Sequence, residues 1–192
     1  MTIPANKTPP EGPTDDELCA RMARGDSAAL AALFQRHGSR LLLMGKVMLG
    51  DASEAEDVVQ EVFLEAWRKA QTFDAERGSV RAWLAVRMRS RCLDRKRSSG
   101  ATRTVLSSSM DDGDGPPDSR SSPERRADHA TLIRSLSALP PEQRDVLLLG
   151  YFEDLSSQEI ASALEIPVGT VKSRVRRALS ELRLLFAQAG ET

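Results

Sequence analysis

The sequence has 192 residues, a formal net charge of −1 and a hydrophobic fraction of 40%, which suffices for one or two small domains. Aromatic residues make up only 4% of it, so there is little material for the core of a large β-sandwich or barrel. Two isolated cysteines, Cys19 and Cys92, and two isolated histidines exclude a closely spaced set of zinc ligands.

Residues 1–13 are rich in proline and polar side chains and show no periodicity, which predicts a disordered lead. They contain no basic region followed by an apolar core, so we expect no signal peptide. No apolar run in the chain approaches the length that spans a membrane. The sequence therefore predicts a cytoplasmic protein without membrane insertion.

Capping signals mark the first two helices. Thr14 and Glu17 have capping-box spacing, and Gly25 is expected to end the helix that they begin. Either Asp26 or Ser27 can cap the next helix, which carries a long series of apolar residues.

A third helix is expected from Glu54 to about Gln71, with Ser53 and Glu56 as its capping box and Gly50 ending the helix before it. Gly38 is a candidate break within that preceding helix. Two adjacent rows at i,i+4 spacing give the third helix a broad apolar face made of Val58, Val59, Val62, Phe63, Ala66 and Trp67.

The other face of the third helix is acidic. Residues 51–65 include six acids and no base. The polar positions on this face are Asp57, Gln60, Glu61 and Glu65. Spacing alone favours simple solvation of such a face.

A fourth helix, capped by Ser79, should run to about Arg97. Residues 81–97 contain seven bases against a single acid, Asp94, and phosphate is the natural counter-charge for so basic a surface. Trp83 could stack on an unpaired base, but a core position is favoured. The expected core side consists of Val80, Trp83, Leu84, Val86 and Leu93.

Residues 99–127 are rich in serine, glycine, proline and aspartate, which predicts a flexible acidic linker. Helical periodicity returns at Asp128 and continues to Leu139. Pro140 and Pro141 stop that helix and begin the next.

The strongest pattern lies between Leu139 and Arg183. Ser156 and Glu159 have capping-box spacing, and Pro167 separates the short helix that they begin from a second helix. The apolar stripe of the second helix is formed by Val171, Val175, Ala178, Leu179 and Leu182, which leaves the other side polar and basic. Two tightly joined helices of this kind predict a helix-turn-helix that enters a DNA major groove. The predicted fold is therefore all-α, with two small helical domains joined by a flexible linker.

Several of these segments resemble one known family. In the C-terminal half, the resemblance to region 4 of bacterial RNA polymerase sigma factors rests on Leu139-Pro140, Arg144, Asp154–Ser156, Glu159–Ala161 and Pro167–Arg174. In the N-terminal half, residues 55–67 are similar to sigma region 2.2, and Trp83-Leu84 with Leu93–Arg95 to regions 2.3 and 2.4. With only these two regions, the chain is similar to the extracytoplasmic-function (ECF, group IV) sigma factors.

The resemblance implies a domain plan and partners. Residues 14–98 would form sigma region 2, residues 128–187 region 4, and residues 188–192 a tail. The expected partners are core RNA polymerase, bound through its β′ clamp helices and β flap, promoter DNA, and an anti-sigma factor.

The resemblance also implies roles for individual residues. The contact with core polymerase would be made by Asp57, Gln60, Glu61 and Glu65. The −10 element would be bound by Arg81, Arg87, Ser90, Arg91, Arg95 and Lys96. The −35 element would be bound by Thr170, Lys172, Ser173, Arg174, Arg176 and Arg177.

Three positions depart from the family pattern. Ser90 stands where many members have Asn near a flipped −10 base, so the −10 preference is expected to differ. Glu165 stands at the turn where many have Gly, and it would be strained if that turn needs a positive φ. Gly150 lacks the −35 contact that an Arg makes in some relatives.

Two other classes of function fit the sequence less well. A transcriptional activator with a LuxR-like helix-turn-helix would explain residues 156–183 but would leave residues 54–97 unexplained. An enzyme has no support, because the chain has no phosphate-binding glycine loop, no plausible triad and no metal-ligand set. We therefore predict no catalytic residue, no metal and no cofactor.

Overall fold

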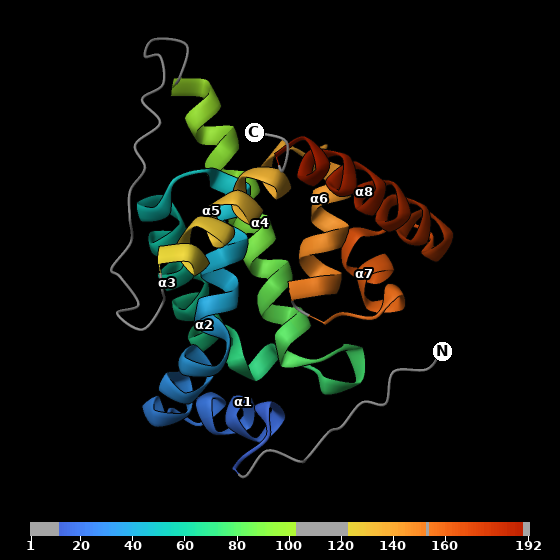
Figure 1. Cartoon of the computed structure of the whole chain (residues 1–192). Helices are drawn as coiled ribbons and strands as arrows, with labels where there is room; N and C mark the ends of the chain where they lie inside the picture. The colour runs from blue at the N-terminus through green and yellow to red at the C-terminus, as the bar shows by residue number, and fades with distance from the viewer. Residues whose placement is uncertain (1–11, 103–122, 153, 190–192) are drawn as a thin grey trace.

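The computed structural model describes residues 12–102, 123–152 and 154–189, and every regular element within these ranges is helical (Figure 1). The all-α prediction is confirmed. The N-terminal half contains α1 (Asp15–Ala23), α2 (Ser27–Leu49), α3 (Ala52–Lys69) and α4 (Val80–Thr102). Two short 3-10 turns, η1 (Ala70–Thr72) and η2 (Ala75–Arg77), connect α3 to α4.

The C-terminal half contains α5 (Pro123–Ala138), α6 (Pro141–Leu147), a π-helical segment η3 (Leu148–Phe152), α7 (Ser157–Leu164) and α8 (Val168–Ala189). The helices α4 and α5 extend into both ends of the predicted linker, and residues 103–122 lie outside the described part. Most of the predicted lead (residues 1–11) and the end of the tail (190–192) also lie outside it.

Four of the predicted helix starts are confirmed by their hydrogen bonds. Complete capping boxes begin α1 at Thr14 and α7 at Ser156. The Asp26 carboxylate caps α2 by accepting from the Ala28 and Ala29 amides. Ser79 Oγ accepts from the Ala82 amide at 3.2 Å at the start of α4.

Two local predictions about α2 and α3 are wrong. The cap of α3 is Asp51 rather than Ser53, because Asp51 Oδ1 accepts from the Glu54 amide at 2.8 Å. The helix therefore begins at Ala52, ahead of the expected start. Gly38 does not break α2, which is continuous from Ser27 to Leu49; a glycine inside a helix weakens it but does not end it when packing holds both sides.

The helices α2, α3 and α4 meet at Gly45. A Cβ atom built on Gly45 would lie 2.6 Å from Met88 Cε of α4 and 2.9 Å from Ala55 Cβ of α3. Both distances are shorter than van der Waals contact, so the close approach of these helices requires a residue without a side chain at this position.

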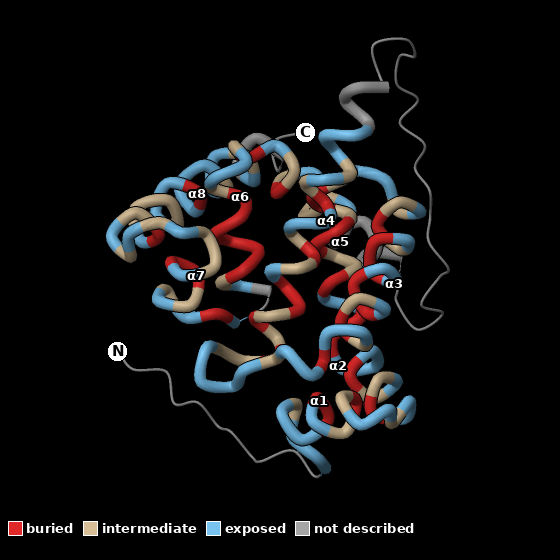
Figure 2. The backbone as a smooth tube through the Cα atoms, turned by 180° about the vertical axis from the view of Figure 1, so that it is seen from behind, coloured by how far each residue is buried: buried red, intermediate tan, exposed pale blue. Residues whose placement is uncertain are grey.

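Buried positions run through both halves (Figure 2). The apolar face predicted for α3 is confirmed, with Trp67 half-buried against the core and the other five residues buried. In α4 the prediction is partly wrong: Val86 is exposed, whereas Met88 and Cys92 are fully buried. Burial raises the pKa of the Cys92 thiol to about 12.

The two halves pack against each other. The helix α5 lies across α2 (Figure 1). Ser137 Oγ of α5 donates to the Val47 carbonyl of α2 at 3.0 Å. Apolar residues of both halves belong to one continuous cluster, in which Leu136 and Leu139 lie with Val47 and Met48.

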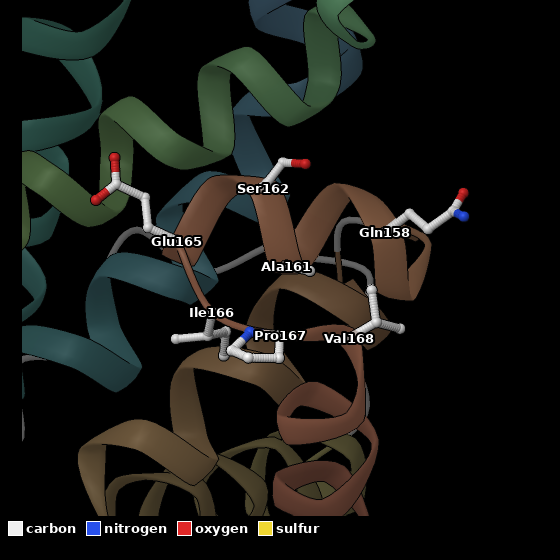
Figure 3. Close-up of a pocket in the computed structure, with 7 residues that line it drawn as sticks. All are labelled: Gln158, Ala161, Ser162, Glu165, Ile166, Pro167 and Val168. Atoms are coloured by element: carbon white, nitrogen blue, oxygen red, sulfur yellow. The ribbon is translucent and has the colours of Figure 1, made fainter.

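The turn between α7 and α8 is built on Glu165, which adopts a left-handed conformation with φ 54° and ψ 43°. The Ile166 amide then donates to the Ala161 carbonyl at 3.0 Å, which closes the last turn of α7. An open hollow of about 540 Å³ lies at this turn, and Glu165, Ile166 and Pro167 are among the residues that line it. Figure 3 labels these lining residues. Because φ of Glu165 is positive, the strain expected for this residue is present.

We predict that Glu165→Gly stabilises the protein by about 0.5–1 kcal/mol, because glycine adopts this conformation without a clash between Cβ and the backbone. Thermal denaturation followed by circular dichroism would measure the change. Glu165→Ala is the matched control, since it removes the same charge but keeps the Cβ. A Glu165→Gly protein no more stable than Glu165→Ala would contradict the prediction.

Candidate functional site

Glu65 of α3 is the centre of an ion-pair network that joins α3 to α4. Its carboxylate accepts from Lys69 at 2.8 Å, from Arg87 at 2.7 Å and from Arg91 at 2.6 Å. The Glu65 side chain is only 12% exposed. Hydrogen bonding to Lys69 and the charges of Arg91 and Arg87 lower its pKa from 4.5 to about 2, although burial acts in the opposite direction.

Glu61 extends this network, because its carboxylate accepts from Arg95 at 2.7 Å. Two residues predicted to contact polymerase, Glu61 and Glu65, are thus bound to three arginines predicted to contact the −10 element. The expectation that the bases of α4 are almost unopposed is wrong. The neighbouring helix α3 supplies the counter-charge through its carboxylates. The sequence of α4 alone does not indicate these partners.

The network continues into an aromatic stack. The Arg87 guanidinium lies 4.4 Å from the centroid of the Trp83 ring, and Trp83 packs against Phe73 with ring centroids 5.5 Å apart. Trp83 is half-buried against the core, as favoured from the sequence. Guanidinium over indole is a favourable cation–π arrangement, so Glu65 and Trp83 together fix the position of Arg87.

The other two residues of the predicted polymerase contact are placed differently. Asp57 and Gln60 are exposed, and their side chains form no hydrogen bond or ion pair with any described residue. Gln60 lines a groove of about 300 Å³ between α2 and α3, together with Phe34, Leu42 and Val59. Phe34 is 45% exposed at this groove.

The remaining −10 candidates are spread along α4. Ser90 and Lys96 are exposed. Desolvation and the neighbouring Arg144 guanidinium lower the pKa of Lys96. Arg81 does not belong to the Glu65 network but is bound to Asp154 in the C-terminal half, at 3.1 Å.

The −35 candidates lie on the first half of α8. Val171 and Ala178 are buried against the rest of the domain, which turns the basic side outward. Lys172, Arg176 and Arg177 are exposed, whereas Thr170, Ser173 and Arg174 are half-buried. Ser173 Oγ donates to the Thr170 carbonyl at 3.0 Å. Within the described residues, none of the four cations of this set forms an ion pair, in contrast to most of the arginines of α4.

Two arginines outside the predicted sites bind carboxylates of the C-terminal half. Arg89 of α4 contacts Asp145 of α6 at 2.7 Å, and Arg40 of α2 contacts Asp154 at 3.5 Å. The sequence contains a signal for Arg89, since it lies two helical turns after Arg81 in the basic run. It contains none for Arg40, whose position in α2 does not indicate a partner in the C-terminal half.

The described ranges contain neither a metal site nor a membrane-spanning helix. No group of three or more His, Cys, Asp or Glu side chains there could hold a metal ion. None of the helices in the same ranges has the length and apolar character needed to cross a bilayer.

The fold and this surface define a helical protein with a helix-turn-helix in its C-terminal half and a basic helix in its N-terminal half. Residues 33–102 match the model of Sigma-70 region 2, and residues 129–182 match that of Sigma-70 region 4. The chain is 34% identical over 172 residues to the ECF RNA polymerase sigma factor SigL of Mycobacterium tuberculosis, covering 88% of this chain and 96% of that protein. It is 36% identical over 163 residues to the ECF RNA polymerase sigma factor RpoE of Cereibacter sphaeroides, covering 82% and 86%.

The chain therefore belongs to the ECF RNA polymerase sigma factors of the sigma-70 family. Among solved structures it is similar to CnrH in complex with the cytosolic domain of CnrY, with a TM-score of 0.68 and 25% identity over 91% of this chain and 97% of that one. The fold is also that of the sigma factor RpoE from Bartonella quintana, solved with the anti-sigma factor NepR, with a TM-score of 0.61 and 23% identity over 81% of this chain and 97% of that one.

We predict that Glu65→Gln destabilises the protein by about 1–2 kcal/mol at pH 7, the scale of hydrogen bonds to a charged group. The folded-state pKa of Glu65 is about 2 and its ordinary value is 4.5, so its contribution is present above the ordinary value and is lost as the pH falls through the folded-state value. The stability difference between wild type and variant should shrink over that range, as measured by urea denaturation.

Glu61→Gln is the matched control for this prediction. The Glu61 side chain is 48% exposed and holds one arginine, so its loss should cost less. Equal effects of the two substitutions would show that Glu65 is not the centre of the network.

Proposed function

We propose that this chain is a dissociable initiation subunit that binds core RNA polymerase, directs it to promoters with particular −10 and −35 elements, and promotes melting of the −10 region. The observation that carries the proposal is the pair of charged helices, α4 and α8, on a chain that belongs to the ECF sigma factors. The basic side of α8 is turned outward on a helix-turn-helix, the arrangement by which such motifs enter a major groove.

In this proposal the exposed side of α3 binds core polymerase. Asp57 and Gln60 are available at the surface beside the apolar groove that Phe34 and Val59 line. A groove with an acidic rim fits a basic, partly apolar helix such as a clamp helix of the β′ subunit. Glu61 and Glu65 contribute to this contact only at its edge, because both are engaged with arginines.

In this proposal α4 binds the −10 element. Arg87 and Arg91 are fixed by Glu65, so little side-chain entropy is lost when they meet phosphates or bases. Melting needs no nucleotide hydrolysis by this chain, since it follows from binding unpaired −10 bases better than paired ones. The residues proposed for this role are Arg81, Arg87, Ser90, Arg91, Arg95 and Lys96.

An anti-sigma factor is proposed as a further partner. The Bartonella quintana RpoE structure contains an anti-sigma factor, and CnrH was solved with the cytosolic domain of CnrY. Co-purification from the source organism would test this; recovery with polymerase alone would count against it.

The LuxR-like activator remains a weaker candidate, because it gives the α3–α4 network no role.

The direct test is run-off transcription with core polymerase and no other sigma factor, on a library of promoter fragments from the source organism. We expect discrete transcripts that require this chain.

In the same assay Arg177→Ala should lower transcription from promoters that depend on the −35 element by about tenfold, the scale of one lost guanidinium contact with DNA. Binding to core polymerase should not change.

Arg183→Ala is the matched control, because Arg183 is exposed further along α8, beyond the proposed contact. Transcription unaffected by Arg177→Ala, or loss of core binding in that variant, would mean that α8 has been given the wrong role. If free protein protected a promoter as strongly as the holoenzyme does, the whole mechanism would be wrong.

We predict that Asp57→Ala weakens binding to core polymerase by about tenfold, as expected for an interface residue worth more than 1 kcal/mol. The variant is informative because Asp57 has no partner among the described residues, so α4 keeps its ion pairs. Fluorescence anisotropy with labelled chain would measure the affinity. Asp16→Asn, an exposed acid on α1, is the control, and equal affinities for the two variants would place the polymerase contact elsewhere.

A further inference from the structure

Gly169 lies in the first turn of α8, where the fold itself does not require a glycine. Its φ is not positive, in contrast to the φ of Gly25 and Gly50, which end other segments in open space. A Cβ atom built on Gly169 would meet no atom of the described residues within 4 Å. At Gly45, by comparison, such an atom would overlap two neighbouring helices. Neither backbone conformation nor packing within the described chain explains the glycine at position 169.

This glycine weakens the helix that contains it. Glycine loses more conformational freedom on folding than alanine does, and it is among the least favourable residues within a helix. Gly169 is exposed, so almost any helix-forming side chain could be accommodated there in the free chain. A residue that costs stability and serves no packing role in the fold is expected to serve contact with another molecule.

Gly169 shares one side of α8 with two cations of the proposed −35 contact. Residues three and seven positions apart lie on the same side of an α-helix, so Gly169, Lys172 and Arg176 form one row. All three are exposed, and neither cation forms an ion pair with a described residue. Val171 and Ala178, which anchor α8, are fully buried and face the rest of the domain. A duplex bound by the two cations would therefore meet the first turn of α8 at Gly169.

The bare first turn suits duplex DNA in particular. A major groove admits a helix whose N-terminal residues lie against the base edges and the backbone, and the depth that the helix reaches is limited by the side chains on its leading turn. Without a side chain, the helix backbone itself can approach the DNA closely. The N–H groups of a first turn have no partner within the helix, so they can then donate to phosphate oxygens.

We infer that Gly169 is a positioning residue of the −35 contact: it keeps the first turn of α8 bare, so that the helix lies deep enough in the groove for Lys172 and Arg176 to reach the DNA. The inference rests on the proposed function and adds Gly169 to the residues of the −35 contact. Stability and DNA binding then make opposite demands at this position, because any side chain that strengthens the helix also holds it away from the duplex.

The variants Gly169→Ala and Gly169→Leu separate these two demands in the full-length chain. Alanine and leucine both favour a helix over glycine, so each variant should raise the midpoint of thermal denaturation by about 1–4 °C. Ser180→Ala is the matched control. Ser180 is exposed further along α8, and its replacement also favours the helix but adds no volume to the surface.

Promoter binding is measured with holoenzyme assembled from core polymerase and each variant, on labelled fragments that the run-off assay has identified. Gly169→Ala should weaken binding by about 5–10-fold, the effect of one extra methyl group in a closely packed contact. Gly169→Leu should weaken it further, because a larger side chain holds the helix further from the DNA. Ser180→Ala should bind as the wild type does, and all variants should bind core polymerase equally.

A second measurement needs no polymerase. The free chains are titrated with a fluorescein-labelled duplex at low salt, where contacts with phosphates alone give measurable binding. Gly169→Leu should bind more weakly than Ser180→Ala. Absence of chain-dependent transcripts with the wild type would count against the proposed function, whereas this titration would still report whether the first turn of α8 lies against DNA.

Opposite changes in the Gly169 variants, with higher stability and weaker DNA binding, would support the inference, since misfolding cannot produce them. Variants that are more stable and bind DNA as well as Ser180→Ala does would overturn it. Variants that lose stability together with binding would also overturn it, because the glycine would then be required by the fold itself.

Discussion

The absence of a side chain at Gly45 is the constraint on which the N-terminal half depends. Only because nothing projects from this position can α2 pack so closely against Ala55 of α3 and Met88 of α4, since a Cβ atom at Gly45 would overlap both side chains. That crossing sets how far apart α3 and α4 run. Their separation places Glu65 within hydrogen-bond distance of Arg87 and Arg91. The charged surface is therefore a product of apolar packing beneath it, and its geometry is as rigid as that packing.

Two kinds of charged surface result. On α4 the guanidinium groups are held by carboxylates from α3 and from the C-terminal half, so they are ordered before any partner arrives. On α8 the cations project from a helix anchored by Val171 and Ala178 and meet no carboxylate in the described part of the chain. Ordered, compensated groups suit a contact that depends on exact placement, such as capture of unpaired bases. Uncompensated groups suit a contact dominated by the charge of the duplex.

Local sequence signals predicted the local structure well. Thr14 with Glu17 and Ser156 with Glu159 form the expected capping boxes, and the α3 periodicity gave the correct buried face, since both depend on residues less than two turns apart. The predicted start of α3 is wrong because Asp51 and Ser53 are both suitable N-cap residues, and spacing alone does not choose between them. The partners of Arg81, Arg87 and Arg89 could not be predicted, because the carboxylates that hold them lie 73, 22 and 56 residues away. Such pairings are decided by tertiary packing, which a helical period does not encode.

The contrast between α4 and α8 also bears on the order of events when the protein meets DNA. An uncompensated cluster of cations attracts a polyanion across roughly a Debye length, about 8–10 Å at physiological salt, whereas a cation paired with a carboxylate has only a short-range dipolar field. Lys172, Arg176 and Arg177 would therefore steer the first encounter, and α4 would engage only once the duplex is near. The kinetics of promoter search would then be set by one helix and the commitment to a site by another.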